Sequence, residues 1–243
     1  SMWRATGQPG QGAIPTTSAV CNNTTIGGIN FTQQTAPATS YGAYLEVATS
    51  NASMTLELHD RLVHFGGLNG TLATAQTVNL DLNSFLATDN LSARKGDANY
   101  SDVQWWLEWY VATGVTVANA TVTVTYNDGT TGALTVQSLA ATRPASHLIS
   151  LNSLVPSVQS GKFIRGIVSV QLSATTGTAG NFGITATRIR MTLGSPIPNY
   201  KFVADWALLG FPEIYNGSCL FPIVLTSTTS SGTIRGGGKI AHG

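Results

Sequence analysis

Residues 121–129 read Thr-Val-Thr-Val-Thr-Tyr-Asn-Asp-Gly, and residues 130–136 continue as a second strand-like run. Successive side chains of a β-strand point to opposite faces, so strict alternation of polar and apolar residues is typical of a half-buried strand. Asp-Gly between two such runs is a strong signal for a tight turn. This stretch therefore predicts an antiparallel hairpin that turns at 127–129, and it favours an all-β fold.

Similar patterns recur along the chain at spacings of roughly ten residues, which is typical of an antiparallel β-sandwich or jelly roll in a single domain. Two strands are expected from Tyr41 onward, with a break at Ser50-Asn51. A short helix or loop is expected over 81–95 and a short helix over 202–209. The remaining expected strands cover 102–111, 163–172, 182–193 and 219–226, with 163–172 and 182–193 pairing across a flexible tip at 175–181.

The two ends of the chain differ from its middle. Residues 1–40 are rich in Gly, Pro, Thr, Gln and Asn, and residues 227–243 contain Arg-Gly-Gly-Gly-Lys at 235–239. Such segments cannot bury enough apolar surface to fold alone. We therefore expect an extended N-terminal arm at 1–40, a β-sandwich core at 41–226 and a flexible C-terminal tail at 227–243.

Alternation also predicts which side chains are buried. In the 102–111 segment, Trp105 and Trp109 share the face expected to join the core. Trp106 and Tyr110 lie on the other face and, with Asn181 in the flexible tip, form a candidate contact surface. If that second face is covered too, both faces belong to the core or to an interface. The predicted core contains Leu56, Leu58, Trp105, Leu107, Trp109, Val122, Val124, Ile167, Val170, Ile184 and Ile189.

Charge is scarce. The chain has 12 basic and 11 acidic residues among 243, or 9% charged and a net charge of +1, against about 25% charged in typical proteins. Nucleic-acid binding through a basic patch is therefore not expected. No stretch approaches the roughly 18 to 20 apolar residues of a membrane-spanning helix. Faces rich in Thr and Asn lose water at modest cost, which favours a protein that packs against neighbours.

Residues 57–64, Glu-Leu-His-Asp-Arg-Leu-Val-His, contain residue types that can hold a metal or transfer a proton. Glu57 and His59 would share a strand face, but a third ligand is not evident and His64 would point the other way. We favour a polar strand edge. Cys21 and Cys219 do not form a zinc pattern and are interpreted as buried thiols, although the sequence does not decide whether they pair.

The sequence predicts no catalytic residue, no cofactor and no metal site. Recognised nucleophile, phosphate-loop and zinc-helix motifs are absent. Glycoside hydrolysis needs two carboxyl groups that converge across a cleft, and no two acidic residues stand out as partners. The available acidic residues are Asp81, Asp89, Asp97, Asp102 and Glu108.

Three stretches resemble sequences of tailed-bacteriophage virion structural proteins. They are His-Asp-Arg-Leu-Val-His-Phe-Gly-Gly-Leu at 59–68, Tyr-Ser-Asp-Val-Gln-Trp-Trp-Leu-Glu-Trp-Tyr at 100–110 and Arg-Gly-Gly-Gly-Lys-Ile-Ala-His-Gly at 235–243. The similarity extends over most of the chain from about Gly7. The resemblance implies a capsid, head-decoration or tail component, and it transfers no active-site residues.

These observations lead to one main hypothesis and two alternatives. The main hypothesis is a virion structural protein that assembles with further copies of itself and with other virion proteins, since arms at both ends can connect subunits. The first alternative is a receptor- or glycan-binding module on the virion surface, for which Trp106, Tyr110 or the loop near Asn181 must be exposed. The second is a glycan-degrading enzyme.

Overall fold

A computed structural model describes residues 2–4, 17–177 and 180–243 of the protein. Within these residues the chain is all-β, with strands in antiparallel sheets and only short helices, as the sequence predicted. Residues 5–16 of the expected arm and 178–179 of the expected tip lie outside the described residues. The helices are η1 (Leu82–Phe85), α1 (Leu91–Arg94), η2 (Asn152–Leu154), η3 (Ser157–Gln159) and α2 (Trp206–Leu209).

The chain forms two compact units instead of one core over 41–226. The first unit contains Cys21–Arg61, Arg188–Gly243 and the strand at 2–4, and the second contains 17–20 and Leu62–Thr187. Each unit has its own cluster of buried apolar side chains, one around Leu45 and Val47 and the other around Trp105 and Trp109. This separation of cores is the physical reason for the division.

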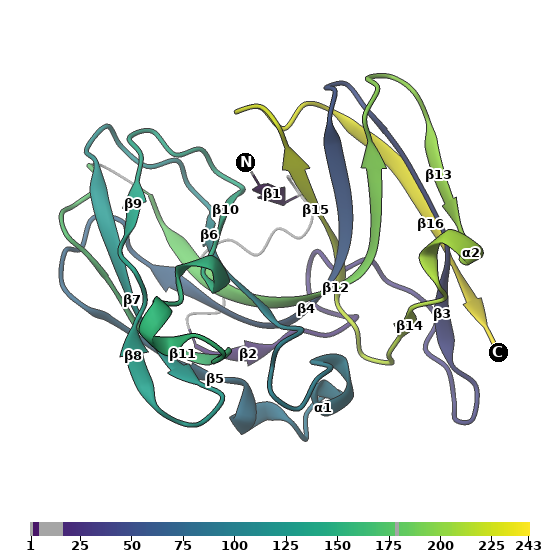
Figure 1. Ribbon diagram of the computed structural model, residues 1–243, viewed down its shortest axis with the longest axis horizontal. Coiled ribbons are helices and arrows are strands. Elements are labelled where there is room, and N and C mark those ends of the chain that lie inside the picture. Colours follow the sequence, from purple (N-terminus) through teal and green to yellow (C-terminus); the bar gives the residue numbers. More distant parts are fainter. Residues whose placement is uncertain (1, 5–16, 178–179) are drawn as a thin grey trace. The chain divides into compact units, whose positions relative to one another are not determined.

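The second unit contains the predicted hairpin. Strand β7 (Ala118–Tyr126) pairs with β8 (Thr131–Ala133), with Thr125 opposite Thr131, so this prediction is confirmed. Both strands belong to a five-stranded sheet (Figure 1). Its other strands are β5 (Gln76–Asp81), β9 (Gln137–Leu139) and β11 (Ile164–Leu172), of which β9 and β11 pair with β7 and β5 pairs with β11.

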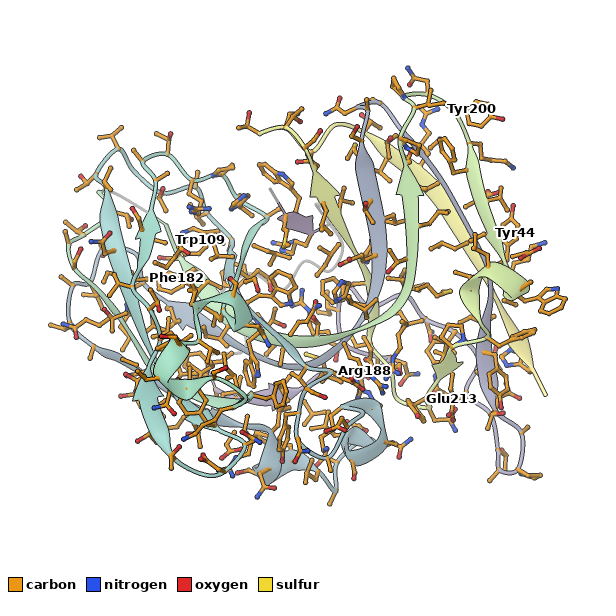
Figure 2. The ribbon with its side chains drawn as sticks, viewed as in Figure 1. Tyr44, Trp109, Phe182, Arg188, Tyr200 and Glu213 are labelled. Atoms are coloured by element: carbon orange, nitrogen blue, oxygen red, sulfur yellow. The ribbon has the colours of Figure 1, made fainter. Side chains whose placement is uncertain are left out.

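A second group of strands in this unit has β6 (Gln104–Trp109) in its middle. Strand β6 pairs on one side with β10 (His147–Ser150) and on the other with residues 182–187 of β12 (Phe182–Ser195). The expected pairing of 163–172 with 182–193 is not formed: β11 pairs with β5 and β7, whereas β12 pairs with β6. Burial explains the choice, because Phe182 stacks on Trp109 at a ring-centroid distance of 5.0 Å (Figure 2).

The first unit is built around β3 (Ser40–Thr49). Strands β13 (Phe202–Asp205) and β14 (Glu213–Ile214) pair along one edge of β3, and β16 (Ile234–His242) pairs along the other (Figure 1). We call these four strands the β3 sheet. In the same unit, β15 (Leu220–Thr226) pairs with β1 (Met2–Arg4) and with the first part of β4 (Met54–Leu68), whose later residues pair with β2 (Ala19–Val20) in the second unit.

Two expectations for the first unit are corrected by the structure. Residues 227–243 are not simply a flexible tail, since they include the nine-residue strand β16 hydrogen-bonded to β3. The helix expected over 202–209 is instead a strand followed by one helical turn. Asp205 begins α2 by accepting hydrogen bonds from the backbone of Ala207 and Leu208, and Gly210, with φ of 69°, ends it.

The expected core is confirmed almost completely. Ten of the eleven predicted core side chains are buried, and Ile189 is half-buried. Cys21 and Cys219 are both buried, as the interpretation as buried thiols requires. The described part of the expected N-terminal arm, 17–40, has little regular structure, but Ile29 forms a bridge with Leu220. That bridge fastens part of the arm to β15.

Candidate functional site

The prediction that Trp106 belongs to a contact surface is wrong, because its side chain is buried. Trp106 is only 2% exposed, and its Nε1 donates a hydrogen bond to Thr187 Oγ1 at 2.8 Å. Tyr110 is half-buried, with its hydroxyl 2.8 Å from His64 Nε2, and only Asn181 is exposed. Nearly every residue of β6 is buried, because both faces of this strand are covered. The second face therefore belongs to the interior.

The histidine motif forms structural contacts inside each unit. In the first unit, His59 Nε2 lies 2.9 Å from Glu57 Oε2, so these residues do share a strand face. Burial lowers the pKa of His59 and thus favours its neutral form. In the second unit, His64 lies beside Tyr110 and 3.9 Å from Glu108 Oε2. No group of three or more His, Cys, Asp or Glu residues suited to a metal occurs among the described residues.

Asp60 in β4 connects this strand with β12 and with the segment just before β15 through buried polar contacts. Its carboxylate accepts hydrogen bonds from Ser218 Oγ at 2.9 Å and from the backbone of Cys219 at 2.8 Å. Arg190 Nη2 lies 3.3 Å from the same carboxylate, and its guanidinium carbon lies 4.9 Å from the centroid of the Tyr215 ring. A buried carboxylate is stable only with such partners. This cluster therefore stabilises the fold.

Three of the five acidic residues of the glycosidase hypothesis accept hydrogen bonds within the fold. Asp81 accepts hydrogen bonds from Nε and Nη2 of Arg165. The side chains of Asp97 and Asp102 accept backbone hydrogen bonds within their own loop. Glu108 is fully buried. These contacts do not bring two carboxyl groups together across a substrate site.

An exposed apolar patch in the first unit is the feature that sequence analysis missed. Trp206 is 56% exposed and stacks on Phe211, with ring centroids 5.4 Å apart and an interplanar angle of 22°. Tyr41 from β3 meets Phe211 edge-on at 6.1 Å. Six of the exposed large apolar side chains lie between positions 197 and 211 of the sequence, and we call this set the 197–211 patch, within which Trp206 and Phe211 are in direct contact. They are Ile197, Tyr200, Val203, Trp206, Leu208 and Phe211.

A charged cluster lies on the β3 sheet at Tyr44, which is labelled in Figure 2. Glu46 Oε2 accepts a hydrogen bond from the Tyr44 hydroxyl at 2.6 Å and lies 3.0 Å from Lys201 Nζ. Lys239 Nζ lies 5.4 Å from the centroid of the Tyr44 ring. The hydrogen bond from Tyr44, with that from Lys201, holds the pKa of Glu46 below its usual value. The same hydrogen bond raises the pKa of Tyr44.

Strand β16 forms one edge of this sheet. Residues 235–239 are exposed, and β16 pairs with β3 on one side and with no other strand of the described chain. A Cβ atom at Gly236 would lie 2.3 Å from the carbonyl oxygen of Glu46, so glycine is needed where β16 approaches β3. The glycine-rich composition therefore serves a close strand contact.

No protein-family model matches the chain, and no curated protein or solved structure shows significant similarity. Within the described residues, no helix is long and apolar enough to cross a membrane.

Proposed function

We propose that the protein is a structural component of a bacteriophage virion, as a capsid, head-decoration or tail protein, and that it acts through symmetric self-assembly. The observation that carries the assembly part is the 197–211 patch. Monomeric soluble proteins rarely expose large contiguous apolar patches, and such patches commonly mark interaction sites. The proposal assigns Trp206, Leu208 and Phe211 to a contact between subunits.

The scarcity of charge supports the same proposal. Charged residues make up 9% of the chain, with a net charge of +1. A subunit contact that buries few charges avoids most of the desolvation penalty of ionised groups. Strand spacing and antiparallel pairing also favour a sandwich or jelly-roll plan, which we include in the proposal.

The virion part of the proposal comes from the resemblance in three stretches. The first two coincide with buried strands, β4 at 59–64 and β6 at 104–109. The third, 235–243, includes most of the exposed strand β16. Two of the resembling stretches therefore lie in buried strands, and the third lies in an exposed strand that a partner can reach.

Solution mass tests the assembly proposal. We expect the wild-type chain to form a discrete oligomer by light scattering, with a ring or shell fragment in negative-stain images. Leu208→Glu places a charge on a side chain that is 72% exposed in the patch, and we expect it to shift the oligomer toward monomer. Val158→Glu is the matched control, because Val158 is 85% exposed in the second unit.

Both variants should retain the wild-type far-ultraviolet circular dichroism spectrum, since neither position is in a core. A folded Leu208→Glu variant that assembles as well as Val158→Glu would remove the patch from the subunit contact. A wild-type chain that stays monomeric at all concentrations would contradict self-assembly.

A second candidate function is glycan binding, and a specific observation moves it from Trp106 to Trp206. An exposed indole held in place by a stacked Phe211 is the kind of surface on which a sugar ring can pack. Glycan-array binding that is lost in Trp206→Ala and retained in Val158→Ala would favour this candidate. Absence of binding to the wild-type chain would reject it.

A further inference from the structure

We infer that β16 of one copy docks along the β13–β14 edge of a second copy, so that the β3 sheet continues from subunit to subunit in a head-to-tail arrangement. This inference rests on the proposed self-assembly and specifies its interface. The occupant of each open edge is thus the opposite edge of an identical chain.

The β3 sheet has two edges that differ in sequence. Strand β16 pairs only with β3, and so do β13 and β14 on the other side, among the strands of the described residues. The outward backbone N–H and C=O groups of an edge strand can form a ladder with a strand from another molecule. Two edges of one sheet therefore allow one copy to contact two neighbours.

Charge separates these two edges. The β16 edge carries Arg235 and Lys239, whereas the opposite edge carries Asp205 at the end of β13 and Glu213 in β14. The basic Lys201, which directly precedes β13, is paired with Glu46. Neither Arg235 nor Glu213 forms an ion pair within the described residues. Opposite charges across neighbouring strands stabilise pairing. The charges therefore suit docking of one edge on the other.

The same charges disfavour a two-fold contact between two β16 strands. An antiparallel pair of β16 strands would place Arg235 and Lys239 of both copies along one junction, and like charges on neighbouring strands are destabilising. A head-to-tail contact instead brings each basic edge to an acidic edge. Repetition of such a contact closes into a ring or continues as a filament, depending on the rotation between copies.

The glycines of β16 suit a backbone contact. Gly236, Gly237 and Gly238 are exposed, and they present no side chain that a docking strand would have to displace. On the other edge, α2 of the 197–211 patch follows β13 directly and precedes β14. A strand that spans both β13 and β14 has to pass α2, whose exposed Trp206 and Leu208 would then add an apolar contact to the backbone contact.

Charge reversal on each edge tests the inference with the full chain. We expect Arg235→Glu/Lys239→Glu to raise the dissociation constant between subunits roughly tenfold or more, because acidic groups then face acidic groups. Glu213→Lys should weaken assembly in the same direction. Asp205 is left unchanged because it caps α2. A chain with all three substitutions should recover much of the wild-type affinity, since the charges are complementary again.

Light scattering over a concentration series, with circular dichroism to confirm folding, separates the outcomes. Weakening by each reversal and recovery in the combined variant support the head-to-tail contact. An assembled wild type whose affinity is unchanged by Glu213→Lys, or a combined variant without recovery, would overturn this interface while self-assembly stands. Stronger pairing of the wild type with Arg235→Glu/Lys239→Glu than with itself would show a β16–β16 contact. A monomeric wild type would overturn both proposals.

Discussion

Gly236→Ala should loosen β16 from β3, because the added Cβ would lie 2.3 Å from the carbonyl oxygen of Glu46. Real Cβ atoms essentially never approach closer than 3.0 Å, and this oxygen belongs to the backbone of the paired strand. One of the two strands must therefore shift. Overpacking of this kind costs about 1–3 kcal/mol, which corresponds to a roughly 5- to 150-fold increase in local opening.

Gly237→Ala is the matched control at the next position. Its Cβ would lie 3.6 Å from the Glu46 carboxylate, which is an ordinary contact. Replacement of glycine by alanine also reduces the entropy of the unfolded chain and can stabilise by up to about 1 kcal/mol. We therefore expect Gly237→Ala to leave the opening of β16 unchanged or to reduce it.

Amide hydrogen exchange of peptides that cover 234–242 measures this opening directly. We expect faster exchange in Gly236→Ala than in Gly237→Ala, under conditions where both proteins are monomeric and folded. Equal exchange rates in the two variants would refute the close approach of β16 to β3. Wild-type amides that exchange as fast as those of an unfolded chain would refute the strand itself.

Three further predictions concern the cores and pH. Trp109→Ala should lower the free energy of unfolding by about 3–5 kcal/mol, whereas Trp206→Ala in the monomer should change it by less than about 0.5 kcal/mol. Urea unfolding measures both effects, and equal effects would contradict the burial of Trp109 and the exposure of Trp206. Asp60→Asn should destabilise by about 3–5 kcal/mol, because it leaves Arg190 buried without its counter-charge; a stability within error of wild type would contradict that role. Burial lowers the pKa of His147 from 6.5 to about 4. The unfolded chain therefore binds the proton first as pH falls through this window, and the free energy of unfolding should decrease. If His147→Asn leaves the pH dependence of the free energy of unfolding unchanged, this histidine is not the cause.

Local alternation accounts for what the sequence could predict. The Thr-Val pattern and Asp-Gly turn at 121–129 encode the β7–β8 hairpin within a short segment, and the alternating faces identify most core residues. Pairing between distant segments is not encoded in this way. The partner of β12 depends on contacts such as Phe182 on Trp109, so adjacency along the chain gave the wrong neighbour for β11.

Burial of both faces of β6 is the reason that the contact surface predicted around Trp106 is wrong. Alternation separates the two faces of a strand, but it does not say whether the second face is covered, and both faces of β6 are buried around Trp106. The composition of the 235–239 run predicts a flexible segment. Its glycines instead permit the approach to β3, which depends on a strand nearly two hundred positions earlier in the sequence.

The most direct test of self-assembly is the absolute solution mass of the wild-type chain over a concentration series. The proposed function predicts a discrete multiple of the 25.4 kDa subunit. It also predicts that this multiple falls toward one subunit in Leu208→Glu but not in Val158→Glu. A wild-type mass of a single subunit at every concentration would contradict the account.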